Sequence, residues 1–309
     1  MNQKTGLVFD IVHGSFVDGY GVRTTIFLKG CPLRCLWCCN PEGQNVYPEL
    51  MFKPKACTDC GRCIEVCPDG AISTNSNTEG IKLEINRKAC TNCGKCIEVC
   101  HYDALHMSGK YMSVDELMAK IKKDEQYYRQ SGGGVTLGGG EATVQDEFAL
   151  ELIRECKRNY IHTAVDTCGY TTTETGFRVL EEADLILFDL KGIDPEAHIR
   201  YTKVTNDIIT DNLKKLGDLG KPIIIRIPLI PCYNDSEESI AGMAKFLNKL
   251  DSVERVDIIP FHEYGKIKYD ELGKEYLLSH ISKDMITREK KNRAAQIFMD
   301  YGLQVQFGG

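Results

Sequence analysis

The chain has 309 residues, of which 42% are hydrophobic, so it exceeds one ordinary domain and can bury a sizeable core. A formal net charge of -6 does not favour a nucleic-acid-binding protein, and no stretch approaches the ~18 continuous apolar residues of a membrane span. Residues 1–4 lack the apolar run of a signal peptide. We therefore expect a cytoplasmic protein that binds neither nucleic acid nor membrane.

Fifteen cysteines in a reducing compartment argue against a disulfide framework, and eleven of them fall in three metal-type spacings. The other four are Cys39, Cys156, Cys168 and Cys232. We expect the last three to be small, mostly buried side chains, because free cysteine is among the most buried residue types. Cys39 directly follows a motif that is complete without it, so we interpret it as a bystander.

The first cysteine motif follows a strand. Residues 6–11 have the pattern of a short strand, 18–24 form a glycine-rich turn, and 25–29 have the β-branched and aromatic content of a buried strand. Next come Cys31, Cys35 and Cys38, with Trp37 before the last. Three thiolates leave one iron of a 4Fe-4S cube without a protein ligand. The alternative is a zinc knuckle that borrows a fourth thiol such as Cys39.

A different kind of sequence occupies residues 51–107. Residues 57–68 and 90–100 are two copies of the run C-x-x-C-x-x-C-x-x-x-C, which is the spacing of bacterial two-cluster ferredoxins. In that arrangement the fourth cysteine of each run serves the other cluster. We therefore assign one 4Fe-4S cluster to Cys57, Cys60, Cys63 and Cys100, and another to Cys67, Cys90, Cys93 and Cys96. A pair of zinc ribbons is the alternative.

After residue 111 helices and strands alternate. Ser113 and Glu116 have capping-box spacing, and the helix that they begin is expected to run to about Gln130. Five strand candidates follow at 135–137, 162–166, 185–190, 223–227 and 256–260, separated by amphipathic stretches such as 147–158 and 236–250. With 25–29 these make six βα units. We predict an open, partial (β/α)6 TIM-like barrel from residues 1–50 and 108–309, with a ferredoxin-like α+β domain inserted at 51–107.

Polar residues and glycines follow the ends of these strands. In a barrel the loops at the carboxyl ends of the strands carry the chemistry, so we expect them to share one site. For any one of them, a structural ion pair or a polar cap is the alternative. The candidates are Gly139, Gly140, Glu141, Asp166, Thr167, Asp189, Lys191, Arg226 and His262.

The motif at 31–38 resembles the radical S-adenosylmethionine (SAM) signature, in which SAM chelates the open iron. Together with the 18–24 turn, Asn-Pro-Glu at 40–42, the two-cluster insertion and Gly-Gly-Glu at 139–141, it makes nearly the whole chain resemble the activating enzymes of glycyl radical enzymes. The resemblance implies reductive cleavage of SAM to a 5′-deoxyadenosyl radical, which abstracts hydrogen from a glycine of the partner enzyme. It also implies three 4Fe-4S clusters, oxygen sensitivity, an anaerobic source, an external donor such as flavodoxin or ferredoxin, and a monomer when free.

The resemblance further implies roles for single residues. Gly139, Gly140 and Glu141 would bind the methionyl amine of SAM, Lys191 and Arg226 its carboxylate, and His262 its nucleoside. Asp166, Thr167 and Asp189 resemble a monovalent-cation site, Trp37 belongs to the cluster motif, and Asp18 would hold the partner's glycine loop. No residue need act as a nucleophile or as a general acid or base. Three positions depart from the family pattern: Tyr20 and Ala142 stand where proline is usual, and Gly138 where serine is usual.

Three other functions remain open from the sequence. One is a radical SAM enzyme that acts on a small molecule or RNA. Another is a ferredoxin-type electron-transfer subunit without catalysis of its own. The third is a binding module structured by zinc.

Overall fold

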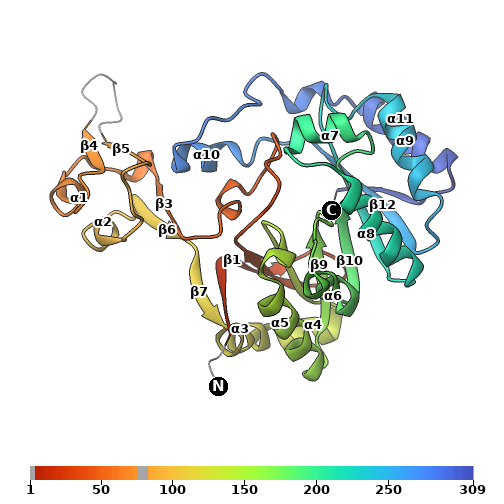
Figure 1. Ribbon diagram of the computed structural model, residues 1–309, viewed down its shortest axis with the longest axis horizontal. Helices are drawn as coiled ribbons and strands as arrows, with labels where there is room; N and C mark the ends of the chain where they lie inside the picture. The colour runs from red at the N-terminus through yellow and green to blue at the C-terminus, as the bar shows by residue number, and fades with distance from the viewer. Residues whose placement is uncertain (1–3, 75–82, 309) are drawn as a thin grey trace.

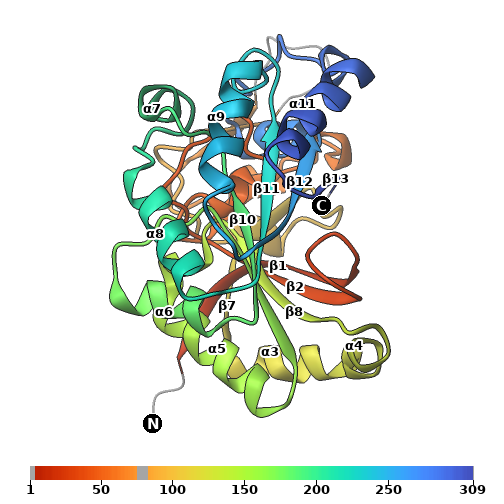
Figure 2. The same ribbon diagram turned by 90° about the vertical axis from the view of Figure 1, so that its right-hand side faces the viewer.

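The computed structural model describes residues 4–74 and 83–308. Residues 1–3, on which the signal-peptide expectation partly rests, and 75–82 of the insertion lie outside the described residues. The main feature is a nine-stranded sheet with the order β13-β12-β11-β10-β9-β8-β2-β1-β7, with helices packed against it (Figures 1 and 2). Among the described helices, none is long and apolar enough to cross a membrane.

Six neighbouring strands of this sheet run parallel, as the six predicted βα units require. Most residues of β2, β8, β9, β10 and β11 are buried on both faces of the sheet, which is typical of parallel sheets covered by helices. The open, partial barrel is therefore confirmed. The strands are β2 (Arg23–Leu28), β8 (Gly134–Gly139), β9 (His162–Thr167), β10 (Leu185–Asp189), β11 (Ile223–Leu229) and β12 (Val253–Pro260).

Three further strands extend the sheet at its edges. β1 (Thr5–Ser15) pairs antiparallel with β2 and, on its other side, with β7 (Lys110–Ser113), while β13 (Val305–Phe307) adds in parallel to β12. The predicted first strand, 6–11, was too short because the hairpin with β2 carries the pairing on to Ser15. That extension brings the β1–β2 turn to the inside of the barrel.

The helices cover the outer face of the parallel strands (Figure 2). Two predicted helices, 147–158 and 236–250, correspond to α5 and α9, with α9 ending three residues earlier than expected. The full set is α3 (Val114–Ile121), α4 (Glu125–Ser131), α5 (Asp146–Arg158), α6 (Glu174–Glu182), α7 (Pro195–Thr202), α8 (Asp207–Asp218), α9 (Glu237–Leu247), α10 (Lys266–Leu272) and α11 (Arg288–Asp300). Besides η3, which is described in the next paragraph, the short 3-10 segments are η1 (Pro41–Gly43), η2 (Pro54–Ala56), η4 (Ala142–Gln145) and η5 (Lys283–Met285).

The capping box at Ser113 and Glu116 is present and begins α3. The expected continuous helix to Gln130 was wrong, since a 3-10 turn, η3 (Lys122–Asp124), separates α3 from α4. At this turn the Asp124 carboxylate accepts hydrogen bonds from the Thr24 hydroxyl, at 2.6 Å, and from the His13 ring. These long-range contacts fix Asp124 at the break.

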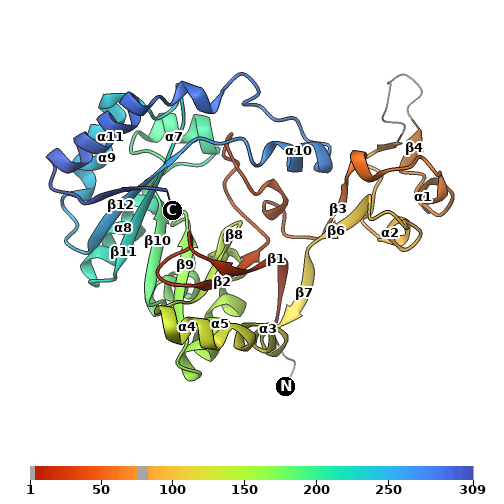
Figure 3. The same ribbon diagram turned by 180° about the vertical axis from the view of Figure 1, so that it is seen from behind.

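The cysteine-rich segment lies to one side of the barrel (Figures 1 and 3). Its strands β3 (Glu49–Phe52) and β6 (Leu105–Ser108) pair with each other, as do β4 (Ile72–Thr74) and β5 (Leu83–Ile85). Two single-turn helices, α1 (Arg62–Glu65) and α2 (Lys95–Glu98), carry the repeated motif. A small separate core of apolar side chains and cysteines stabilises the segment.

Candidate active site

A cavity of about 440 Å³ lies at the carboxyl ends of the parallel strands. The cluster-motif cysteines and the strand-end residues meet in it, although they are far apart in the sequence. Of the predicted strand-end residues, Glu141 alone is absent from its lining. The predicted residues that line it are Asp18, Cys31, Cys35, Trp37, Cys38, Gly139, Gly140, Asp166, Thr167, Asp189, Lys191, Arg226 and His262.

Residues 30–38, which we call the cluster-motif loop, carry Cys31, Cys35 and Cys38. Backbone hydrogen bonds hold this loop from two sides. On one side the Cys31 N–H donates to the Gln44 carbonyl at 3.0 Å. On the other, the Arg34 and Leu36 N–H groups donate to carbonyls at the end of α7, at 2.7 and 3.0 Å. The Trp37 ring packs against both Tyr201 and Tyr233, at centroid distances of 6.0 and 6.1 Å, and these two tyrosine rings contact each other at 5.0 Å.

The three thiols are a donor set that fits an iron–sulfur cluster. Burial raises the pKa of Cys31 and of Cys38 to about 11 and that of Cys35 further, so burial by itself favours their neutral thiol forms. All three belong to the free cysteines and none forms a disulfide. A group that binds thiolates must therefore supply the positive charge, as cluster irons do.

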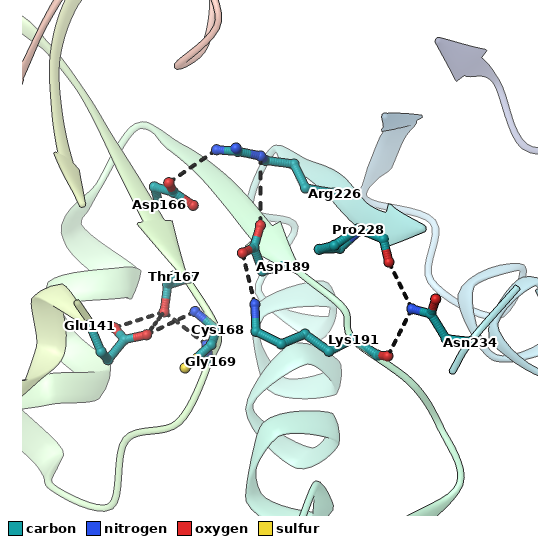
Figure 4. A network of polar contacts seen from close by, with 10 residues as sticks. All are labelled: Glu141, Asp166, Thr167, Cys168, Gly169, Asp189, Lys191, Arg226, Pro228 and Asn234. Atoms are coloured by element: carbon teal, nitrogen blue, oxygen red, sulfur yellow. Dashed lines mark hydrogen bonds and ion pairs between the residues drawn. The ribbon is translucent and has the colours of Figure 1, made fainter. Parts of the chain in front are cut away.

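On the opposite wall two carboxylates and two cations are interleaved (Figure 4). Lys191 Nζ lies 2.8 Å from Asp189 Oδ2, and Arg226 Nη1 lies 3.0 Å from Asp166 Oδ2. Arg226 Nε lies 3.6 Å from Asp189 Oδ1. Neither Arg226 contact has hydrogen-bond geometry, so Arg226 Nε and Nη1 and Asp189 Oδ1 are buried without a hydrogen-bond partner. Such atoms are available to a polar ligand.

The two carboxylates differ in their electrostatics. Burial raises the pKa of Asp166 to about 7, although Arg226 opposes the rise. Burial also acts on Asp189, but Lys191 and Arg226 together hold its pKa below the ordinary value. For Lys191 the cost of burial is outweighed by Asp189 and nearby cysteines, so its pKa lies above the usual range. Lys191 is therefore a fixed positive charge in the cavity wall.

His262 follows β12 and lines the same cavity. Its ring stacks on Tyr264 at a centroid distance of 4.4 Å, and its buried Nδ1 has no hydrogen-bond partner. Burial holds the pKa of His262 below its ordinary value. A neutral, stacked imidazole with a free nitrogen is suited to contact a planar polar group.

Glu141 has a different position from the one expected. Its carboxylate is fully buried and accepts from Thr143 N and Oγ1, at 3.1 and 2.9 Å, from Thr167 Oγ1, at 2.9 Å, and from Cys168 N, at 2.8 Å (Figure 4). Its own N–H donates to the Gly30 carbonyl at 2.7 Å, which turns the side chain toward the end of β9. In this structure the Glu141 carboxylate is directed at the end of β9 and is not part of the cavity lining, and the expectation that Glu141 binds the methionyl amine of SAM stays a prediction.

The glycines before Glu141 are required by close backbone contacts. A Cβ at position 140 would lie 2.2 Å from the Gly30 carbonyl oxygen, and Gly139 has a φ of +112° with Leu28 N 2.6 Å from its Cβ position. At position 138 a Cβ would lie 3.1 Å from Asp166 Cβ. The Gly-Gly turn therefore docks against the cluster-motif loop as well as lining the cavity.

The β1–β2 turn closes another side of the cavity through Asp18. The Ser15 and Thr25 hydroxyls each donate to Asp18 Oδ2 at 2.6 Å, which fixes the carboxylate. The Tyr20 hydroxyl donates to Glu254, and the Arg255 guanidinium carbon lies 5.3 Å from the centroid of the Tyr20 ring. Burial and Glu254 raise the pKa of Tyr20 to about 12. Tyr20 thus anchors the turn to β12.

The cysteines outside the three motifs have mixed outcomes. Cys156 is fully buried in the core, as expected, whereas Cys232 is exposed, so that expectation was wrong. Cys168 is buried but lines the cavity, and Cys39 lines it as well. The only sequence signal that these two cysteines belong to the cavity was their position: Cys39 follows Cys38, and Cys168 follows Thr167.

In the insertion two separate cavities are each lined by four cysteines. One is lined by Cys57, Cys60, Cys63 and Cys100, and the other by Cys67, Cys90, Cys93 and Cys96. Each set combines three cysteines of one run with the fourth cysteine of the other. Among the described residues, no three His, Cys, Asp or Glu side chains are grouped closely enough to hold a single metal ion.

Comparison with known proteins gives two family matches. Residues 88–244 match the Radical SAM superfamily, and 56–104 match the 4Fe-4S dicluster domain. Two solved structures share the fold at low identity. QueE from Escherichia coli has a TM-score of 0.51 at 12% identity, covering 98% of this chain and 93% of that one. SuiB from Streptococcus suis has a TM-score of 0.54 at 16% identity, covering 95% and 50%.

Curated relatives match over most or nearly all of the chain. The trans-4-hydroxy-L-proline dehydratase activating enzyme of Clostridioides difficile is 41% identical, covering 98% of this chain and 99% of the relative. The (2S)-3-sulfopropanediol sulfolyase activating enzyme of Bilophila wadsworthia is 39% identical, covering 94% and 96%. The choline trimethylamine-lyase activating enzyme of Oleidesulfovibrio alaskensis is 40% identical, covering 89% and 90%. The chain belongs to the radical SAM activating enzymes of glycyl radical enzymes.

Proposed function

We propose that the 440 Å³ cavity binds SAM beside a 4Fe-4S cluster on Cys31, Cys35 and Cys38, and that a glycine loop of the partner enzyme enters past Asp18. The observation that carries the proposal is the meeting of three partly buried cysteines with Lys191 and Arg226 in one cavity. The cluster, when bound, supplies the electron that cleaves SAM to methionine and a 5′-deoxyadenosyl radical. The residues of the chain bind SAM, orient it and exclude water.

The polar wall provides groups for each part of SAM. Lys191 and the unsatisfied Arg226 guanidinium favour its carboxylate, and the Gly139–Gly140 backbone lies where an amine can be held. The free Nδ1 and stacked ring of His262 suit the nucleoside. Leu33, Ile230 and Phe261 line the same cavity with apolar surface, which limits the access of water.

A monovalent cation is the second ligand that we propose for this wall, with Asp166, Thr167 and Asp189 as its ligands. Oxygen donors of this kind suit hard cations. In the described structure the Arg226 guanidinium supplies the positive charge between the two carboxylates. Arg226 would have to release at least one carboxylate when both the cation and SAM are bound.

We also propose that the two four-cysteine cavities of the insertion hold 4Fe-4S clusters, which brings the total to three. Their electrons would come from an external donor, flavodoxin or ferredoxin, and the chain would act as a monomer until it meets its partner. The relatives at 39–41% identity serve a dehydratase, a sulfolyase and a trimethylamine-lyase. Such similar identities indicate the class of the partner and do not single out one enzyme.

Anaerobic reconstitution tests this proposal. We expect about twelve irons per chain, formation of 5′-deoxyadenosine with SAM and reductant, and a glycyl radical doublet in EPR with a peptide spanning the glycine loop of a partner. Cys35→Ala should lose about four irons and all SAM cleavage while the insertion clusters remain. Cys232→Ala, at an exposed cysteine outside the cavity, is the matched control. Cluster reduction without 5′-deoxyadenosine in the unaltered protein would instead indicate an electron-transfer subunit.

A further inference from the structure

We propose that the two insertion clusters act in a fixed order. In this order the site of Cys67, Cys90, Cys93 and Cys96 is the inner site, next to the cluster-motif loop. The site of Cys57, Cys60, Cys63 and Cys100 is the outer site, where an external low-potential one-electron donor delivers its electron. The inference rests on the proposed function, because it presupposes that both sites hold clusters.

The inner site contacts the strand that leads out of the barrel. Leu50 on β3 is 1% exposed and lines the inner cavity. Its N–H donates at 2.9 Å to Oδ1 of Asn92, which stands between Cys90 and Cys93. The inner site is therefore joined directly to the beginning of β3.

The beginning of β3 is in turn joined to the cluster-motif loop through a buried lysine. Lys29, fully buried, places its Nζ 3.0 Å from Glu49 Oε2 and donates to the Glu42 carbonyl at 2.5 Å. Lys29 is two residues from Cys31, whose N–H donates to the Gln44 carbonyl at 3.0 Å. A short path of packed and hydrogen-bonded groups thus connects Cys31 with Asn92.

The outer site lies farther along the same strand. Phe52, two residues beyond Leu50 and on the same strand face, lines the outer cavity. Two residues of strand correspond to about 7 Å. Tyr102, which also lines the outer cavity, is 52% exposed. Each site has one exposed cysteine, Cys60 in the outer site and Cys93 in the inner site. Exposure of the ligands therefore does not distinguish the two sites, and we base the order on the residues that surround them.

The figures agree with this order. In Figures 1 and 3, α2, which carries Cys96, is drawn nearer the barrel than α1, which carries Cys63. Each site also takes one cysteine from the other run, so the two sites remain close neighbours. An electron can therefore pass from outer to inner site within one small core.

A second contact braces the insertion at the inner site. Arg87 donates to the Leu50 carbonyl and, at 3.0 Å, to the Glu271 carbonyl on α10. From the same helix Lys268 contacts Glu42 at 2.5 Å and Asn40 at 2.8 Å, beside the cluster-motif loop. Helix α10 thus holds the inner site and the cluster-motif loop to one rigid element, which fixes their separation.

The electron balance is simple. One electron leaves the donor, which is oxidised by one electron, and it passes the outer and inner sites to the site of Cys31, Cys35 and Cys38. No bond forms or breaks along this route. Because one-electron transfer slows steeply with distance, removal of either insertion cluster should have a distinct signature.

EPR on the reconstituted full chain tests the order without using catalysis. Cys93→Ala removes the inner cluster and Cys60→Ala the outer one, and each should lose about four irons. In dithionite-reduced protein, a nearby paramagnetic cluster speeds the relaxation of the SAM-site signal. We expect Cys93→Ala to lose this enhancement, so that the signal saturates at lower microwave power, while Cys60→Ala retains most of it. The opposite ranking, or equal effects, would overturn the order.

If an alanine variant fails to fold, Cys93→Ser and Cys60→Ser serve instead, because a serine oxygen can retain the cluster while altering its EPR signal. The relaxation of the SAM-site signal should then change more in Cys93→Ser than in Cys60→Ser, and the reverse ranking or equal changes would overturn the order. Freeze-quench EPR with reduced flavodoxin is the second readout: Cys60→Ala should slow reduction of the inner cluster, whereas reduction by dithionite should be unaffected. Equal rates with flavodoxin would contradict an outer port. About four irons in the unaltered chain would refute the proposed cluster content itself, so the two failures are distinguishable.

Discussion

The Thr167 hydroxyl lies 2.9 Å from both carboxylate oxygens of Glu141. Glu141 follows the end of β8, and Thr167 is the last residue of the neighbouring parallel strand β9, so this contact joins two strand ends that meet at the cavity. Since Glu141 also accepts from Cys168 N, it fixes the backbone at the point where Thr167 and Cys168 face the cavity. We therefore interpret Glu141 as a positioning residue.

Replacement of Glu141 by glutamine should test that role. An amide would direct an N–H donor at groups that already donate, which leaves buried donors unpaired and should cost about 1–3 kcal/mol of unfolding free energy. We expect weaker SAM binding with the SAM-site cluster still assembled, measured by thermal unfolding, KM for SAM and iron content. Glu182→Gln, at a partly exposed carboxylate paired with Arg154, is the control. Normal stability together with lost SAM affinity would point instead to direct contact with SAM.

Lys191 should matter through its charge. Lys191→Met removes the cation beside Asp189 and one proposed partner of the SAM carboxylate. We therefore expect KM for SAM to rise roughly thirtyfold, which corresponds to a loss of about 2 kcal/mol in binding free energy. Iron content should stay unchanged. The matched control is Lys214→Met, which removes an exposed lysine whose pair with Asp211 contributes little. An unchanged KM would exclude Lys191 from the SAM site.

Gly140→Ala should displace the cluster-motif loop. The new Cβ would lie 2.2 Å from the Gly30 carbonyl oxygen, and backbone on both sides leaves no flexible side chain to move away. We expect poor loading of the SAM-site cluster with normal loading of the insertion clusters, measured by iron content and EPR. Gly242→Ala is the control, since nothing lies within 4 Å of its Cβ position in α9 and helix propensity should stabilise it by up to about 1 kcal/mol. Full loading in Gly140→Ala would contradict the docking role.

His198 should make the support of the cluster-motif loop sensitive to acid. It is 3% exposed, its Nδ1 lies 2.8 Å from the Val204 carbonyl, and burial holds its pKa below the ordinary 6.5. The neutral ring is favoured in the folded protein, so between the folded pKa and about 6.5 the unfolded chain binds more protons and stability rises with pH. We expect Tm to fall as pH drops below about 6.5.

The same measurement on His198→Asn separates this effect from acid loss of the clusters. The asparagine amide can donate to Val204 but does not titrate in this range, so its Tm should fall less steeply with acid. Because His198 packs in α7, whose end accepts from Arg34 and Leu36, the variant also reports on the loop. Identical pH profiles for the two proteins would remove His198 from the argument.

The sequence by itself determined the features that depend on local spacing. The positions of the eleven motif cysteines, the sequence patterns of the six parallel strands and the capping box at Ser113 are each set by residues close together in the chain. Parallel strands place their carboxyl ends at one edge, so even the sharing of one cavity by Asp166, Asp189 and Arg226 followed from the strand pattern.

Only the tertiary structure decided where individual side chains point. The Glu141 side chain turns away from the cavity because the Glu141 N–H donates a hydrogen bond to the carbonyl of Gly30, more than 100 residues earlier in the chain. The helix after Ser113 breaks at Asp124, where the Thr24 hydroxyl contacts it. Cys232 is exposed, and Cys39 and Cys168 line the cavity, although their residue type predicts burial alone. The destination of a side chain depends on distant neighbours that spacing along the chain does not contain.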